Sequence, residues 1–157
     1  MLVVTLVVGL VLAPTVAADD GPSRVAAEYL DAVDKGDLAK AKSLTARFPK
    51  LSADDLDRLT AKAAAGLKQS AIKLVPEQTK IAGDCAVVVG KQSKFDLDPI
   101  YLLRQDGRWR VLPTITRFDH KTIELSATQQ ADFPKLKTWF QAKKAENYKQ
   151  QNDSKPQ

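Results

Sequence analysis

Few residues of this 157-residue sequence have a type and spacing suited to chemistry. Asp119 stands directly before His120, the only histidine, and a carboxylate beside an imidazole can in principle transfer protons. Neighbouring residues on a strand point to opposite faces, however, so a solvated turn explains this pair better. Asp119 and His120 are therefore weak acid–base candidates, and the sequence assigns no catalytic residue.

Metal and cofactor sites are not predicted. Asp96 and Asp98 flank Leu97, but a bound calcium ion takes about 6–8 oxygen ligands, so an Asp-rich turn ahead of Pro99 is the simpler interpretation. Cys85 is the only cysteine, which excludes an intrachain disulfide, and it is interpreted as a small apolar residue of a strand. The sequence contains no P-loop, dinucleotide fingerprint, nucleophile elbow or zinc-ligand spacing.

Basic residues outnumber acidic ones by 24 to 19, which gives a formal net charge of +5. Many of them fall on the last two predicted strands and on a predicted C-terminal helix. They are Arg104, Arg108, Arg110 and Arg117, followed by Lys135, Lys137, Lys143, Lys144 and Lys149. A basic surface can attract an anionic polymer, a phospholipid surface or an acidic protein. A solvated surface that keeps the chain soluble is the preferred explanation, and without a platform of exposed aromatic residues no nucleic acid is expected.

The first segment, MLVVTLVVGLVLAPTVAADD, has the form of a secretory signal. An apolar run is followed by small residues that allow cleavage after Ala17 or Ala18, and the run is shorter than the ~20 apolar residues that span a bilayer. Residues 1–18 are thus predicted to be a signal peptide, and the mature protein to be periplasmic or extracellular. No Lys or Arg precedes the run, and an uncleaved N-terminal anchor is the alternative.

Three amphipathic helices are predicted after this segment. The first begins at Pro22 or Ser23, the second is capped by Asp37 and stopped by Pro49, and the third is capped by Ser52. Apolar residues at spacings of three and four form their stripes. These are Val25, Ala26, Tyr29, Leu30 and Val33; then Leu38, Ala41, Leu44 and Phe48; then Leu56, Leu59, Ala63 and Leu67.

Past Gln69 the pattern changes to the two-residue rhythm of about four antiparallel strands. The first two are residues 71–82 and 85–93, joined at Gly83-Asp84, where a Gly in first position suits a type II′ turn. Pro76 keeps the first strand at an edge or a bulge.

Residues 100–113, IYLLRQDGRWRVLP, predict a hairpin with Asp106-Gly107 as its two-residue loop. The resulting pairs are Gln105 with Arg108, Arg104 with Trp109, Leu103 with Arg110, Leu102 with Val111 and Tyr101 with Leu112. Arg104 is expected to pack its stem on the indole of Trp109. The face with Tyr101, Leu103 and Leu112 is half apolar, so another element is expected to cover part of it.

The C-terminal part is predicted as an extension over residues 119–149 with one helix, followed by a disordered tail over 150–157. The helix begins either at a capping box that starts with Ser126 or at Asp132-Phe133-Pro134. Leu136, Trp139 and Phe140 are expected to dock it for about two turns. The whole chain is therefore predicted to be α+β, with three helices on a curved antiparallel sheet and a C-terminal helix.

Residues 26–45, AAEYLDAVDKGDLAKAKSLT, read as a helix pair with a K-G-D break between the helices. Residues 83–90, GDCAVVVG, and residues 101–113, YLLRQDGRWRVLP, read as late strands with a D-G hairpin and a Trp. In this order the three segments resemble the nuclear transport factor 2-like superfamily, the cone-shaped α+β fold shared with ketosteroid isomerase and SnoaL-like proteins, and they look most like its small exported bacterial members. The resemblance covers residues 22–118, and the sequence departs from the family pattern after Phe118.

The resemblance implies a pocket between the sheet and the first helix, for which Tyr29, Tyr101 and Trp109 are lining candidates. Fold alone does not decide function. Because no catalytic group is assembled, the first hypothesis is a non-enzymatic accessory domain that binds a small apolar ligand or a protein partner. The alternative is a SnoaL-like enzyme that transfers protons on a small organic substrate. Relatives often dimerise through the open sheet face, so a homodimer through the sheet is also considered.

Overall fold

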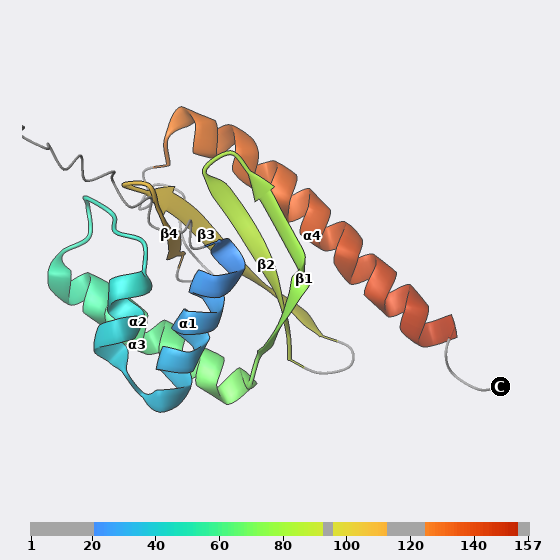
Figure 1. Ribbon diagram of the computed structural model, residues 1–157, viewed down its shortest axis with the longest axis horizontal. Coiled ribbons are helices and arrows are strands. Elements are labelled where there is room, and N and C mark those ends of the chain that lie inside the picture. The colour runs from blue at the N-terminus through green and yellow to red at the C-terminus, as the bar shows by residue number, and fades with distance from the viewer. Residues whose placement is uncertain (1–20, 93–95, 113–124, 154–157) are drawn as a thin grey trace, which may run out of the picture.

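The computed structural model describes residues 21–92, 96–112 and 125–153 of the chain. It is an α+β structure with three N-terminal helices, an antiparallel sheet and a C-terminal helix, as predicted (Figure 1). The elements are α1 (Pro22–Lys35), α2 (Leu38–Leu44), α3 (Ala53–Ser70), β1 (Lys73–Ala82), β2 (Cys85–Lys91), β3 (Leu97–Gln105), β4 (Arg108–Val111) and α4 (Ala127–Asp153). The predicted signal peptide over residues 1–18 lies outside the described residues.

Local side-chain chemistry sets the helix starts. The Asp37 carboxylate accepts from the Lys40 amide at 2.9 Å, and the Ser52 hydroxyl accepts from the Asp55 amide at 3.1 Å, which confirms both predicted caps. The Asp55 carboxylate contacts the Ser52 hydroxyl at 2.8 Å. Gly36 ends α1 with φ 74°, a left-handed conformation that Gly adopts without steric cost.

Helix α2 is shorter than predicted, because it ends at Leu44 and not at Pro49. Thr45 leaves the helix in an extended conformation and forms a parallel bridge with Val111 at the edge of the sheet. The Ala46 amide then donates to the Val111 carbonyl at 2.8 Å. Pairing with β4 thus competes with a further helical turn, and Leu38, expected on the buried stripe, is 47% exposed.

The buried face of α3 also differs from the prediction. Its fully buried residues are Thr60 and Ala64, whereas Leu56 and Leu59 are only half-buried. Ala64 belongs to the core cluster that also contains residues of α1 and α2. Leu56 borders a surface hollow between α2 and α3.

The four strands follow one another in the order β1-β2-β3-β4, all antiparallel. The predicted hairpin register is confirmed from Gln105–Arg108 to Leu102–Val111. Asp106 and Gly107 have φ values of 51° and 73°, as a type I′ turn requires at both loop positions. The β1 register shifts between Val75 and Thr79, which is the irregularity expected around Pro76.

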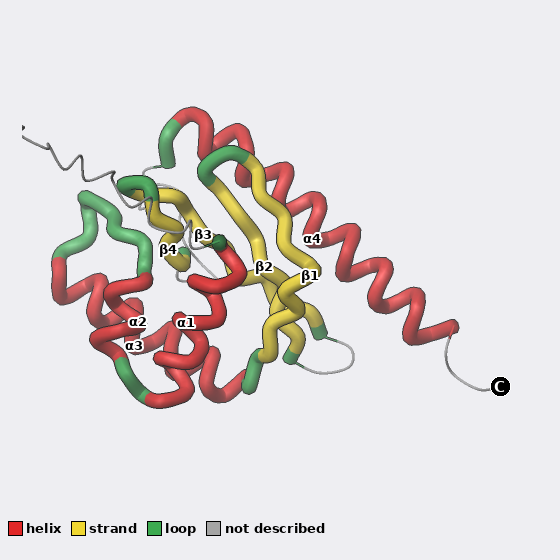
Figure 2. Tube along the Cα trace, viewed as in Figure 1, coloured by secondary structure: helices red, strands yellow, loops and turns green. Residues whose placement is uncertain are grey.

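The sheet is covered on both faces (Figures 1 and 2). Helix α1 packs on one face, with α2 and α3 beside it at the same end of the molecule. The alternating residues of the strands fill this layer together with the α1 stripe. The buried members are Val25, Ala26, Tyr29, Ala32, Val33, Ala41, Ala64, Ala86, Val88, Ile100, Leu102, Trp109 and Val111.

Helix α4 covers the opposite face, where the sequence predicted that a cover was needed. Its residues Leu136 and Phe140 are buried, and the Phe133 ring lies 4.8 Å from the Tyr101 ring. The buried side chains below it are Ala46, Phe48, Cys85, Val87, Val89, Leu97, Tyr101, Leu103 and Leu112. The apolar surface that suggested a dimer is thus covered within one chain, and the dimer stays a prediction.

Of the two starts considered for α4, the capping box is correct. The Ser126 amide donates to Gln129 Oε1 at 3.0 Å and the Gln129 amide donates to Ser126 Oγ at 3.2 Å, while Pro134 lies inside the helix. The helix continues to Asp153, so residues 150–153, predicted as part of a disordered tail, are helical. After Pro134 this part of the chain has no Gly or Pro to end a helix, and it is rich in Ala, Lys, Gln and Glu.

Candidate functional site

The three predicted pocket residues are separated by the sheet. Tyr29 and Trp109 belong to the layer under α1, whereas Tyr101 lies on the opposite face under α4. Their side chains are 1%, 5% and 7% exposed, respectively. The space between α1 and the sheet is occupied by side chains from both elements, so these three residues do not line one pocket.

Neither buried tyrosine is suited to acid–base chemistry at neutral pH. Burial raises the pKa of Tyr29, and the adjacent Thr45 side chain opposes part of this rise. The Thr45 hydroxyl itself donates to the Ala41 carbonyl at 2.9 Å, and the Tyr29 hydroxyl finds no hydrogen-bond acceptor or donor of normal geometry among the described residues. Burial also raises the pKa of Tyr101. Both phenols therefore stay neutral.

The other residues that were candidates for acid–base or metal chemistry do not form a site within the described parts of the chain. Asp119, His120 and Arg117 lie outside these parts, so the proton-transfer pair stays a prediction. Asp96 is exposed, and the Tyr148 hydroxyl approaches it at 3.5 Å. Within residues 21–92, 96–112 and 125–153, no group of three or more His, Cys, Asp or Glu is placed to hold a metal ion.

The predicted basic surface is divided between the two sides of the hairpin. The Arg104 guanidinium lies 5.9 Å from the centre of the Trp109 ring, which confirms the expected cation–π contact on the α1 side. Arg108 and Arg110 are on the other side, because neighbouring positions of the Arg104–Trp109 pair face the opposite way. Arg108 is exposed, and Arg110 donates to the Ser43 carbonyl.

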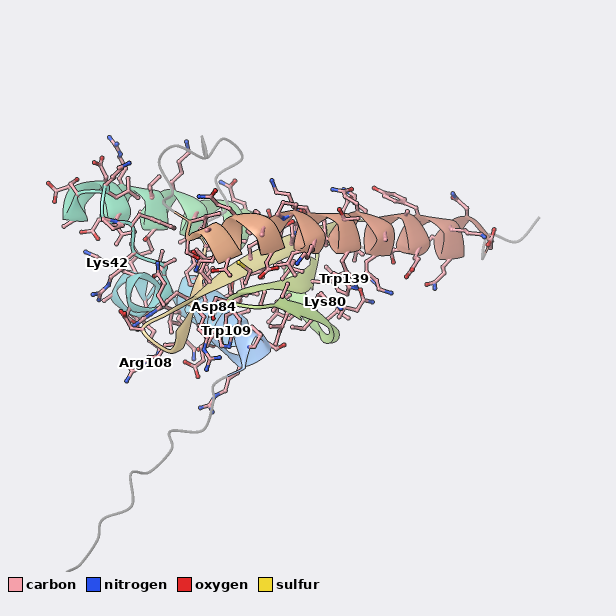
Figure 3. The ribbon with its side chains drawn as sticks, turned by 90° about the horizontal axis from the view of Figure 1, so that it is seen from above. Lys42, Lys80, Asp84, Arg108, Trp109 and Trp139 are labelled. Atoms are coloured by element: carbon pink, nitrogen blue, oxygen red, sulfur yellow. The ribbon has the colours of Figure 1, made fainter. Side chains whose placement is uncertain are left out.

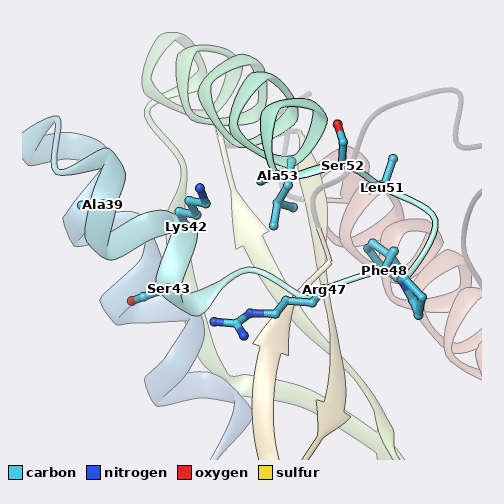
Figure 4. Close-up of a pocket in the computed structure, with 10 residues that line it drawn as sticks. Ala39, Lys42, Ser43, Arg47, Phe48, Leu51, Ser52 and Ala53 are labelled. Atoms are coloured by element: carbon cyan, nitrogen blue, oxygen red, sulfur yellow. The ribbon is translucent and has the colours of Figure 1, made fainter.

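A hollow at the end of the molecule where α2 and α3 lie is the candidate site, and sequence reasoning did not find it. We call it the α2–α3 hollow; it has a volume of about 550 Å³ and opens between α2, the segment over residues 45–52 and the start of α3 (Figure 4). Six apolar residues, two serines and two cationic residues line it, with Lys42 directed toward α3 and Arg47 toward Ser43. The lining residues are Ala39, Lys42, Ser43, Arg47, Phe48, Pro49, Leu51, Ser52, Ala53 and Leu56.

The sheet edge fixes one wall of this hollow. The Gln105 side-chain amide binds both backbone groups of Arg47: the Arg47 amide donates to Gln105 Oε1 at 2.9 Å, and Gln105 Nε2 donates to the Arg47 carbonyl at 2.8 Å. Together with the isolated bridge of Thr45 and the hydrogen bond of Ala46 to Val111, these bonds tie residues 45–47 to the edge of the sheet at β4. Residues 45–47, which carry the Arg47 side chain, are therefore each hydrogen-bonded or paired to the sheet.

The rim of the α2–α3 hollow is cationic. Lys42 forms an ion pair with Asp57 across the gap between α2 and α3. The Arg47 guanidinium has no carboxylate within ion-pair distance in the portion of the chain that the structure covers. Figure 3 shows Lys42 and Arg108 toward the same end of the molecule, away from the C-terminal end of α4.

A second hollow of about 580 Å³ adjoins the first and shares Ala39 and Lys42 with it. Its other lining residues are Leu38, Asp57, Arg58, Thr60 and Ala61. The Lys42–Asp57 ion pair lies where the two hollows meet, because Lys42 lines both and Asp57 lines the second. The two adjoining hollows together form a groove along α2. Leu38 is exposed because it lines this groove.

These features define an α+β protein with a sheet packed on both faces and an amphipathic surface groove beside its second helix. Comparisons of the chain with family models, with curated proteins and with solved structures give no match. The similarity to the nuclear transport factor 2-like superfamily therefore rests on the sequence motifs alone. Within the described residues, no helix is both long and apolar enough to cross a membrane.

Proposed function

We propose that this chain is an exported, non-catalytic domain of the nuclear transport factor 2-like type, which binds a small apolar ligand in the α2–α3 hollow. The hollow itself is the observation that supports this function. Its volume of about 550 Å³ falls in the range of about 300–1,000 Å³ that is usual for ligand sites, and apolar side chains form most of its lining. Export and family membership are supported by the N-terminal segment and the motifs of the sequence.

A small ligand is favoured over a protein partner by the distribution of exposed apolar side chains. A large contiguous apolar patch on a protein surface marks a site of interaction with another protein. The large apolar residues that the structure leaves exposed are Leu38 on α2, Ile81 on β1 and Tyr148 on α4, which belong to three separate elements. Only Leu38 adjoins the groove.

The neutral fluorophore N-phenyl-1-naphthylamine tests this proposal. We expect its fluorescence to rise on binding to the full mature chain, and Ala39→Phe to weaken binding about tenfold or more, because the added ring occupies space shared by both hollows. Ala65→Phe is the matched control, since Ala65 is exposed on α3 and lines neither hollow. The absence of binding to the unaltered chain, or equal binding to both variants, would refute the proposed site.

A further inference from the structure

We infer that the ligand of the α2–α3 hollow is an amphipathic acid whose carboxylate or phosphate group is bound by Arg47 and Lys42. This inference rests on the proposed function and adds the chemical class of the ligand. It depends on where the two cations lie relative to the apolar lining, and on how the acidic residues nearby are already engaged.

Arg47 is the main anchor. Its backbone is bound on both sides by the Gln105 amide, so its side chain extends from a fixed point on the rim. The guanidinium borders an apolar lining and lacks an acidic partner among the residues described. A planar guanidinium of this kind can bind a carboxylate or a phosphate through two parallel hydrogen bonds.

Lys42 can bind the same anion because its ion pair with Asp57 is solvent-exposed and therefore weak. The side chains of Lys42 and Asp57 are 40% and 53% exposed, and ion pairs with this exposure contribute little stability. A ligand acid at the rim can therefore replace Asp57 as the partner of Lys42. The ligand's apolar part would then lie along Ala39, Ala53 and Leu56.

The other acids at the start of α3 do not oppose this arrangement strongly. Asp55 is engaged by the Ser52 hydroxyl and by the Arg58 guanidinium, each at 2.8 Å. Asp54 is exposed and does not line the hollow. No carboxylate thus lines the α2–α3 hollow itself, and Asp57, the partner of Lys42, borders only the second hollow.

Isothermal titration with decanoate, decyl phosphate and 1-decanol, below the concentrations at which they form micelles, tests the inference on the full mature chain. We expect one or both acids to bind about tenfold more tightly than the alcohol. Arg47→Gln should remove this preference, because it should lower the affinity for the acids much more than the affinity for 1-decanol. Arg108→Gln is the matched control, because it removes the same charge from an exposed residue that does not line the hollow.

A second pair of variants examines Lys42. Asp57→Asn should strengthen decanoate binding severalfold because it removes the competing carboxylate, while Asp54→Asn, with the same change in charge, should have a smaller effect. If 1-decanol binds as tightly as both acids, the inference is wrong and the proposed function stands. If none of the three probes binds, the inference is wrong, and if N-phenyl-1-naphthylamine also fails to bind, the proposed function is wrong as well. If Arg47→Gln weakens binding of the alcohol as much as binding of the acids, Arg47 is not an anion anchor.

Discussion

Gln105 shows how one side chain can extend a sheet. Its amide supplies a donor and an acceptor to the backbone of Arg47, which are the two bonds that a neighbouring strand would otherwise make. The contact joins the end of β3 to a segment 58 residues earlier in the chain. Gln105 is thus a positioning residue for the candidate site, since it acts through Arg47 and does not line the hollow itself.

Replacing this side chain should affect both stability and binding. Gln105→Ala is expected to lower the free energy of unfolding by about 1 kcal/mol, because two partly exposed hydrogen bonds are lost. The affinity for decanoate should also fall in Gln105→Ala. Gln105→Glu can still accept from the Arg47 amide, so its stability and its affinity should lie between those of the unaltered chain and Gln105→Ala. Urea unfolding measures the first effect and calorimetry the second. Gln69→Ala, at an exposed position of α3, is the control. If both alanine variants change the free energy of unfolding and the affinity for decanoate equally, Gln105 does not position Arg47.

At the scale of elements, α4 is part of the core and not an appendage. Leu136 is fully buried against the sheet, and Phe140 packs with Val89 and Leu97 further along it. The second turn of α4 contacts the β1–β2 turn as well: Gly83 has φ 54°, and a Cβ atom there would come within 2.6 Å of the Asp132 carboxylate. The helix therefore covers the second face of the sheet and contacts the turn between β1 and β2.

Truncating Leu136, the fully buried residue by which α4 packs on the sheet, should destabilise the whole fold. Leu136→Ala is expected to lower the free energy of unfolding by about 2–5 kcal/mol, as for other fully buried leucines. Gln141→Ala, five residues later at an exposed position, should change the free energy of unfolding by less than about 0.5 kcal/mol. Urea denaturation followed by tryptophan fluorescence and by circular dichroism compares the two. A small loss for Leu136→Ala would mean that α4 is docked only loosely.

The sequence predicted those parts of the fold that neighbouring residues decide. Asp37, Ser52 and Ser126 cap helices through residues three positions away, and Asp106-Gly107 sets the register of its hairpin. The end of α2 was missed because it depends on Val111, and the α2–α3 hollow was missed for the same reason. No local pattern distinguishes exposed alanines that border a hollow from those, such as Ala65, that do not.

For the molecule as a whole, the dense packing of both sheet faces predicts a loss of stability in alkaline solution. Burial, helped by Asp132 and Asp84, raises the pKa of Cys85 from 9.0 to about 11. Burial raises the pKa of Tyr29 and Tyr101 in the same direction. The folded state thus favours the protonated groups, so the stability they contribute is complete below the unfolded pKa values and is lost as pH rises through the folded ones.

Unfolding free energies measured between about pH 8 and about pH 11 check this expectation. They should fall with rising pH for the unaltered chain, and more gradually for Cys85→Ala, which lacks the thiol. The comparison is between slopes, because the substitution also removes a buried sulfur atom and lowers stability at every pH. Identical slopes would show that the Cys85 thiol ionises alike in the folded and unfolded states.

The link between residues 45–47 and the β4 edge also has a consequence for the order of events during synthesis. Helices α2 and α3 leave the ribosome long before Val111, yet the wall between them needs Gln105 and Val111 to be in place. A nascent chain that stops short of the hairpin therefore lacks the contacts that hold residues 45–47 as one wall of the α2–α3 hollow. Under the proposed function, a ligand can thus be held in the α2–α3 hollow only after the hairpin has folded.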